Sequence, residues 1–275
     1  MTHEFYDYLV NVKGYSVRTM MSYRNDITAF VAWAHTERRG ARWSTLTKGD
    51  IEAFIADNAK AGKAPASTNR YLASISALYK WMQTQGYKVE NPCRYASRRK
   101  VGETLPNTID TLELRAAYEH SHGMVHIMLG LLYVTGCRIQ ELLDLRWEDI
   151  NFKTWAVRLH GKGQKDRIVF ATEETLAELD TIREQGNHEG RLFWIDQRTA
   201  RRMIYDALKA HCHAKQLSPH AIRHTVATQM AANGANVVTI AKLLGHEHIE
   251  TTQKYIDLAK ATDLRAAQRA YIKFN

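Results

Sequence analysis

The sequence contains little proline, few cysteines and no long apolar run. With 4 prolines and 15 glycines among 275 residues, of which 45% are hydrophobic, the composition is typical of a folded, helix-rich protein. No segment approaches the roughly 20 consecutive apolar residues that a membrane-spanning helix needs. The first residues, MTHEFYDYLV, are acidic where a signal peptide would be basic. We therefore expect a cytoplasmic protein.

Cysteine usage agrees with that expectation. Cys93, Cys137 and Cys212 are odd in number, widely spaced and never arranged as a C-x-x-C pair. A disulfide framework is therefore not expected, and reduced thiols are typical of a cytosolic protein.

Positive charge is in excess and is unevenly distributed. Of the formal net charge of +9, residues 1–106 contribute 16 basic minus 9 acidic side chains, or +7, and residues 107–275 contribute 22 minus 20, or +2. A polyanion partner would explain a basic N-terminal part, because Lys and Arg that neutralise phosphates release counterions. Charge alone is equally compatible with a merely soluble basic surface.

The length predicts two domains, since single domains usually contain roughly 100–150 residues. The segment SRRKVGETLPN, at 97–107, loses helical periodicity and gathers charge, glycine and proline, as linkers do. We expect a helical domain at 1–96, a linker at 97–107 and a second domain at 108–275.

Four helices are predicted in the first domain, at about 3–12, 16–39, 48–61 and 67–85. Thr47 with Asp50 three residues later is a pattern of helix N-termini. Polar side chains fall outside the apolar stripes of the second and fourth helices, where we expect exposure: Arg18, Ser22, Asn25 and Asp26, and Asn69, Arg70 and Ser74. Such faces are usually solvated, and DNA contact is the alternative.

The second domain is predicted to be mostly helical with a small β-sheet. Two short strands, 156–160 and 166–170, flank the sequence GKGQK, which places Lys162 at the tip of a hairpin. Helices are expected at about 111–120, 124–134, 138–145, 173–185, 199–214, 219–232, 237–244, 251–258 and 264–271.

Six side chains in this domain have the chemistry for cutting a DNA phosphodiester without a metal. Charge on the phosphoryl oxygens is stabilised by cations, and the planar fork of Arg can hold two oxygens at once. Lys and His move protons, and a Tyr hydroxyl can act as a covalent nucleophile. The residues are Arg138, Lys162, His220, Arg223, His246 and Tyr255.

Several segments resemble the tyrosine recombinase family of phage integrases and Xer-type enzymes. They are TGCRIQELLDLRWEDI, LHGKGQKDRIVF, and SPHAIRHTVATQM with IAKLLGHEHIETTQKYIDL; YSVRTMMSYRNDITAFVAWA and ASTNRYLASISALYKWM are similar to the core-binding domain. The resemblance covers nearly the whole chain, with the motifs in the right order. It implies a mainly α, four-helix, SAM-like N-terminal domain and an α+β, mostly helical catalytic domain.

The resemblance also implies roles. Arg138 and Arg223 would hold the phosphate, with His246 bonded to it. Lys162 would protonate the departing 5′ oxygen, and Lys165 is its rival. His220 would manage a proton near the nucleophile, Tyr255.

Neighbouring residues are assigned less directly. Glu141 lies three residues after Arg138, on the same helical face, and is expected to orient it or a neighbouring catalytic group. His224 is interpreted as a structural, hydrogen-bonding histidine. The DNA-contacting candidates are Arg18, Ser22, Asn69, Arg70, Ser74, Arg98, Arg99, Lys100 and Lys165.

The implied reaction passes through a covalent 3′-phosphotyrosyl intermediate and needs no cofactor, metal or ATP. A tetramer would exchange strands between two DNA sites through a Holliday junction, clamping DNA between the two domains. The last segment, about 262–275, would dock into a neighbouring protomer. Accessory DNA-bending proteins are possible partners.

We expect a compact, Xer-like system without an arm-binding domain, because the sequence begins almost at once with segments similar to the core-binding helices. Xer proteins continue Tyr-Thr-His at the nucleophile, whereas this sequence reads YIDLAKATDLRAA. Integration, excision, resolution and inversion therefore all stay open.

Three alternatives remain. The cluster His211, Cys212, His213, His220 and His224 suggests zinc, but Ala221 stands where a zincin helix has Glu. A type IB topoisomerase shares the same catalytic side chains. A catalytically silent DNA-binding relative would retain the fold alone.

Overall fold

The computed structural model describes residues 1–102, 106–161, 166–184, 189–246, 249 and 251–260. The chain divides into two compact units, Met1–Glu103 and Thr104–Asn275. Lys162, Lys165 and the helix expected at 264–271 lie outside the described residues. No described helix is both long and apolar enough to span a membrane.

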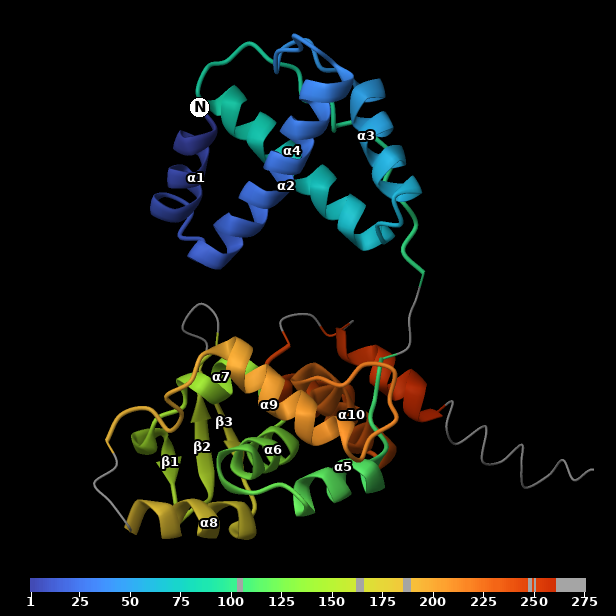
Figure 1. Cartoon of the computed structure of the whole chain (residues 1–275). Helices are drawn as coiled ribbons and strands as arrows, with labels where there is room; N and C mark the ends of the chain where they lie inside the picture. Colours follow the sequence, from blue (N-terminus) through green and yellow to red (C-terminus); the bar gives the residue numbers. More distant parts are fainter. Residues whose placement is uncertain (103–105, 162–165, 185–188, 247–248, 250, 261–275) are drawn as a thin grey trace, which may run out of the picture. The chain divides into compact units, whose positions relative to one another are not determined.

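The first unit contains the four expected helices (Figure 1): α1 (Thr2–Asn11), α2 (Val17–Glu37), α3 (Lys48–Lys60) and α4 (Pro65–Thr84). The capping box that begins α3 is present, because Thr47 and Asp50 bond each other's backbone N–H groups. Helix α4 packs against both α2 and α3. Phe30, Phe54 and Ile75 are buried where these helices meet.

The prediction that the polar side chains of α2 and α4 are exposed was wrong for Asp26 and Ser74, which are buried, and Ser22 and Asn69 are only partly exposed. Asp26 is 1% exposed and Ser74 is 3% exposed. The Ser74 hydroxyl donates to Asp26 Oδ2 at 2.7 Å, and Arg70 lies 2.8 Å from Asp26 Oδ1. A buried carboxylate requires such partners, which periodicity of apolar residues alone does not reveal.

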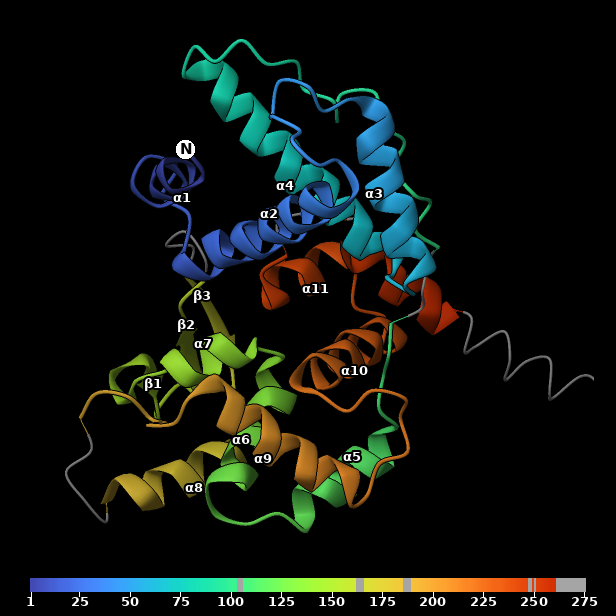
Figure 2. The same ribbon diagram turned by 45° about the horizontal axis from the view of Figure 1, so that its top comes forward.

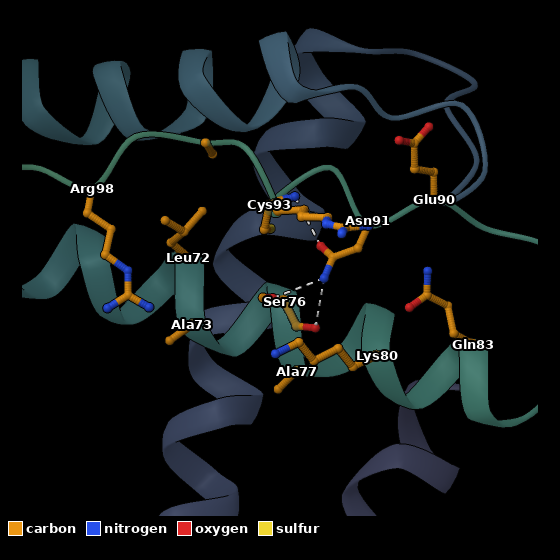
Figure 3. Close-up of a pocket in the computed structure, with 12 residues that line it drawn as sticks. Leu72, Ala73, Ser76, Ala77, Lys80, Gln83, Glu90, Asn91, Cys93 and Arg98 are labelled. Atoms are coloured by element: carbon orange, nitrogen blue, oxygen red, sulfur yellow. Dashed lines mark hydrogen bonds between the residues drawn. The ribbon is translucent and has the colours of Figure 1, made fainter.

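A polar hollow lies along α4 and the segment that follows it (Figure 3). Asn91 connects the two segments that line it: its side chain donates to Ser76 Oγ at 3.0 Å and accepts from the Cys93 N–H at 3.0 Å. Lys80 and Arg98 contribute basic side chains to its lining.

The second unit is mostly helical, with one small antiparallel sheet in the order β1-β2-β3. Its elements are α5 (Thr111–Glu119), α6 (Gly123–Thr135), α7 (Ile139–Asp144), a 3₁₀ turn (Trp147–Asp149), β1 (Ile150–Asn151), β2 (Ala156–Leu159), β3 (Arg167–Phe170), α8 (Glu173–Glu184), α9 (Gln197–Lys209), α10 (Pro219–Ala232) and α11 (Val237–Leu244). A further helix occupies residues 251–260.

The sheet and several helix boundaries differ from the sequence-based expectation: α4 begins at Pro65 instead of 67, and α9 ends at Lys209 instead of 214. The sheet has a third strand, β1. It contains two residues, which is too few to show the alternation of apolar and polar side chains that predicts a strand. Helix α9 begins two residues earlier than expected, because the Asp196 carboxylate accepts from the backbone N–H groups of Arg198 and Thr199.

Helix α6 forms the centre of this unit. It packs against α5, α7, α8, α9, α10 and β3 (Figure 1). Met128, Leu129 and Leu132 of this helix are buried, while Met124 near its start and Tyr133 near its end are exposed. Helix α10 in turn contacts α11, which Figure 2 brings into view. The C-terminal ends of α6 and α11 are thereby fixed relative to α10.

Candidate active site

The C-terminal ends of α6 and α11 hold two of the predicted arginines. The last carbonyls of a helix have no partner within the helix and carry its negative dipole end. Arg223, on α10, donates to Gly136 O at 2.7 Å and to Leu244 O at 2.5 Å. Arg138 donates to Gly245 O at 2.9 Å. Residues from distant parts of the sequence therefore place two guanidinium groups at one point.

Both helix ends require glycine at this point. Gly136 and Gly245 have φ angles of 59° and 66°, in the left-handed region that L side chains rarely adopt. A Cβ at Gly136 would lie 2.7 Å from Leu244 Cδ2, and one at Gly245 would lie 2.9 Å from an Arg167 nitrogen. The carbonyl positions thus depend on backbones that only glycine allows at this packing distance.

Arg138 precedes α7 and is oriented by Glu141 within the same turn. Glu141 Oε2 accepts from the Arg138 backbone N–H, and Oε1 accepts from its Nη1, both at 2.8 Å. The contact expected from their spacing is therefore present. The Arg138 side chain is 40% exposed, whereas Arg223 is 3% exposed. Of these two cations, Arg138 is the one open to an incoming anion.

Arg167, at the start of β3, is part of this cluster and was missed in the sequence analysis. It donates to both carboxylate oxygens of Glu141 at 2.8 Å and to Leu243 O at 2.7 Å. Its side chain is 11% exposed. An arginine in the strand sequence DRIVF resembles an ordinary surface residue, so its one available signal was its place in the motif LHGKGQKDRIVF. Arg167 connects the sheet to α7 and α11.

Glu141 and Arg223 stay ionised at neutral pH although both are buried. Burial of Glu141 opposes its ionisation, but hydrogen bonds from Arg167 and from the Arg138 backbone lower its pKa to about 2. Burial, and secondarily the nearby Arg138, lower the pKa of Arg223 to about 10. At neutral pH the site therefore contains three guanidinium cations around one carboxylate, a net positive cluster suited to a phosphate.

Tyr255 lies on helix 251–260 and is 1% exposed. Its hydroxyl is 2.6 Å from Nδ1 of His224. The ring of His246 stacks beside it, with ring centroids 6.2 Å apart. Burial raises the pKa of Tyr255, an effect that the positive charge of Arg223 reduces. The resting hydroxyl is therefore protonated and surrounded by imidazoles.

Two histidines, His224 and His246, lie beside the tyrosine, and a third, His220, lies beside His224. His220 and His224 occupy successive turns of α10 with ring centroids 5.3 Å apart, and His246 Nδ1 is 2.8 Å from Thr252 Oγ1. Burial and neighbouring positive groups lower the pKa of all three, to about 4 for His224 and His246. All three are therefore neutral at pH 7. Among the described residues, no three His, Cys, Asp or Glu side chains form a metal-binding group.

The structure gives contacts for both α10 histidines. His224 was expected to be a structural, hydrogen-bonding histidine, and its ring nitrogen lies 2.6 Å from the hydroxyl of Tyr255. His220 was expected near the nucleophile, and its ring contacts that of His224. The sequence did not reveal the partner of Tyr255, because the position of Tyr255 depends on tertiary structure.

We expect the stability of the protein to fall as pH decreases from about 6.5 to about 4. In that window His224 and His246 bind protons in the unfolded chain but not in the folded one, so unfolding takes up protons. Each contributes a slope of at most about 1.4 kcal/mol per pH unit. The free energy of unfolding, measured by urea titration at several pH values in this range, should depend less steeply on pH in His246→Asn. The Asn side chain keeps an acceptor toward Thr252. An unchanged slope would contradict the assignment.

Some DNA-contacting candidates of the first unit are exposed, and others form hydrogen bonds within the fold. On α2 and α4, Ser22 accepts from Arg70 at 3.3 Å, so these two side chains share one surface. Asn69, expected to be exposed, is partly buried and exchanges hydrogen bonds with the backbone of Arg99. The exposed candidates are Arg18, Arg70, Arg98 and Lys100, while Asn69 and Ser74 act within the fold.

Comparisons with known proteins place this geometry in a family. Residues 105–262 match the phage integrase family, and residues 2–86 match the phage integrase N-terminal SAM-like domain. The chain is 27% identical over 279 residues to the tyrosine recombinase XerD of Listeria innocua, covering 94% of this chain and 93% of that one. It is 29% identical over 277 residues to the same-named protein of Haemophilus influenzae, with coverages of 94% and 93%.

Solved structures share the fold. The XerH site-specific recombinase bound to a palindromic difH substrate has a TM-score of 0.78 at 16% identity, covering 98% of this chain and 84% of that one. A lambda integrase tetramer bound to a Holliday junction has a TM-score of 0.72 at 18% identity, with coverages of 92% and 76%. Since one family model alone matches more than half of the residues, this chain belongs to the phage integrase family.

Proposed function

We propose that this protein is a site-specific tyrosine recombinase that cuts and rejoins DNA through a covalent 3′-phosphotyrosyl intermediate. The observation that carries the proposal is the convergence of Arg138 and Arg223 on two helix ends, with Tyr255 close enough to Arg223 for the guanidinium charge to oppose the burial that raises the pKa of its hydroxyl. Family membership and the similarity to enzymes named tyrosine recombinases support the same reaction.

Cleavage is a transesterification. The Tyr255 oxygen forms a bond to phosphorus, the bond from phosphorus to the 5′ oxygen breaks, and Lys162 protonates that oxygen. Arg138 and Arg223 neutralise the charge on the non-bridging oxygens, and His246 donates a hydrogen bond to one of them. A 5′ hydroxyl from a second duplex then reverses the steps. Because the intermediate retains the energy of the phosphodiester, the reaction needs no ATP.

Double-stranded DNA is the partner of both units. The first unit supplies the basic excess and the exposed arginines, and the second supplies the reacting groups. We propose a tetramer at the exchange stage, with the segment 262–275 contacting a neighbouring protomer and bending proteins assisting where the sites require them. We also assign the protein to the cytoplasm, where its DNA would lie.

A two-site plasmid assay tests this function. Covalent adducts recovered from DNA flanking the coding sequence would first define the cleavage site. A plasmid carrying two such sites should then yield new junctions, and a plasmid with one site should not. Relaxation of supercoils without new junctions would indicate a topoisomerase, and binding without either product would indicate a silent relative. Either result would overturn the proposal.

A further inference from the structure

Attack by Tyr255 requires that its hydroxyl proton goes to another group. The closest recorded partner of this hydroxyl is Nδ1 of His224, at 2.6 Å. Both residues are held rigidly, His224 in the middle of α10 and Tyr255 within helix 251–260 with 1% exposure. Bulk water is therefore excluded from the hydroxyl, and the imidazole is the available acceptor.

The surroundings of His224 keep its imidazole unprotonated, and therefore free to accept a proton, before DNA binds. From α10 it faces His220 and Arg223, and from helix 251–260 it faces Tyr255 and Lys254. His246, between the two helices, also lies close. Burial, and then the charges of these groups, lower the pKa of His224 and keep the imidazole neutral at rest. A phosphate bound by the arginines would offset their positive charge, so DNA itself makes His224 a better base.

We propose that His224 accepts the Tyr255 proton during cleavage and returns it during rejoining. In cleavage, the O–H bond of Tyr255 breaks, the proton moves to Nδ1 and the oxygen electron pair forms the bond to phosphorus. In rejoining, the phosphorus–tyrosine bond breaks and the leaving oxygen takes the proton back. The inference rests on the proposed function and assigns one step of it to a residue outside the six predicted from the sequence.

The position of His220 supports the assignment of the proton to His224. The ring of His220 contacts the ring of His224 edge to face, with centroids 5.3 Å apart. His224, in turn, contacts the tyrosine hydroxyl. The proton on His224 would therefore be adjacent to a second neutral imidazole. His220 remains a candidate for contact with the phosphate.

Substitution His224→Asn tests the inference, because the amide oxygen can replace Nδ1 as a hydrogen-bond acceptor but cannot take a proton. We expect single-turnover cleavage of a nicked suicide duplex to slow by about 10²–10⁴-fold, with DNA affinity within about twofold. The acidic limb of the pH–rate profile should disappear. His213→Asn is the matched control, since its side chain is 89% exposed and pairs with Glu113; its rate should equal that of wild type.

Fluorination of the nucleophile separates proton transfer from mere positioning. Placing 3-fluorotyrosine at 255 makes the phenol more acidic. In the His224→Asn background it should therefore raise the cleavage rate at least about tenfold over that of His224→Asn with ordinary tyrosine. In wild type, the acidic limb should stay at the same pH, because it belongs to the imidazole. A limb that moves with the phenol, or a slow variant that fluorination does not rescue, would overturn the inference.

The two proposals fail in different ways. Without adducts in wild type, the recombinase function itself would be wrong. If wild type forms adducts and His224→Asn forms them at the same rate, the proton-transfer role alone would be wrong. Should His224→Asn fail to fold, as judged by thermal melting, the pH profile of fluorinated wild type decides the question.

Discussion

Substitution Tyr255→Phe is expected to remove all strand cleavage while leaving DNA binding within about twofold. The substitution deletes one oxygen from a side chain that is 1% exposed, so the packing of helix 251–260 against α10 and α11 should persist. The lost hydrogen bond to His224 should lower the free energy of unfolding by about 1–3 kcal/mol, because the partly buried imidazole loses its partner. Gel-shift affinity and adduct formation on a suicide substrate, measured together, separate the two effects.

Tyr205→Phe is the matched control, because Tyr205 belongs to the same unit and is 42% exposed. Its cleavage rate should be that of wild type. Residual adduct in Tyr255→Phe would mean that another residue attacks the phosphorus, and a joint loss of binding and cleavage would mean that the substitution acts through folding.

Substitution Arg167→Ala should lower the free energy of unfolding by about 3 kcal/mol. Glu141 is 5% exposed and would lose its bidentate partner, and an uncompensated buried charge typically costs about 3–5 kcal/mol. We expect the lower end, because Arg138 still pairs with Glu141. Cleavage should also slow, since Arg138 is held through the same carboxylate. Urea unfolding and single-turnover cleavage measure the two consequences.

The exposed pair Arg146–Glu148 provides a comparison within the same unit. Its side chains are 53% and 56% exposed, so Arg146→Ala should change the free energy of unfolding by about 0.5 kcal/mol or less. The double substitution Arg167→Met with Glu141→Met should recover much of the stability without recovering cleavage. If Arg167→Ala and Arg146→Ala lowered the free energy of unfolding equally, the buried Arg167–Glu141 pair would contribute no more to stability than an exposed pair.

The sequence predicted the helices and the family because both depend on local patterns. Long amphipathic segments such as α2 and α4 have an apolar repeat that survives any tertiary arrangement, and the capping residue Thr47 acts on its own helix. The motifs around Arg138 and Tyr255 combine residue type with spacing, so the phage integrase family was identified before the structure.

Contacts between distant segments were not predictable in this way. Arg167 reaches Glu141 from another element, and Ser74 reaches Asp26 from a second helix. His220 and His224 lie on one face of α10, and the choice between them as the partner of Tyr255 depends on how helix 251–260 packs. The short strand β1 exists because β2 provides its hydrogen-bonding partner.

The most direct test of the account is to identify the amino acid that carries DNA. A nicked duplex trapped by the wild-type protein, digested with protease and analysed by mass spectrometry, should yield one peptide, containing Tyr255 joined to a 3′ phosphate. A DNA-linked peptide without Tyr255, or a link to a 5′ phosphate, would contradict the proposed mechanism.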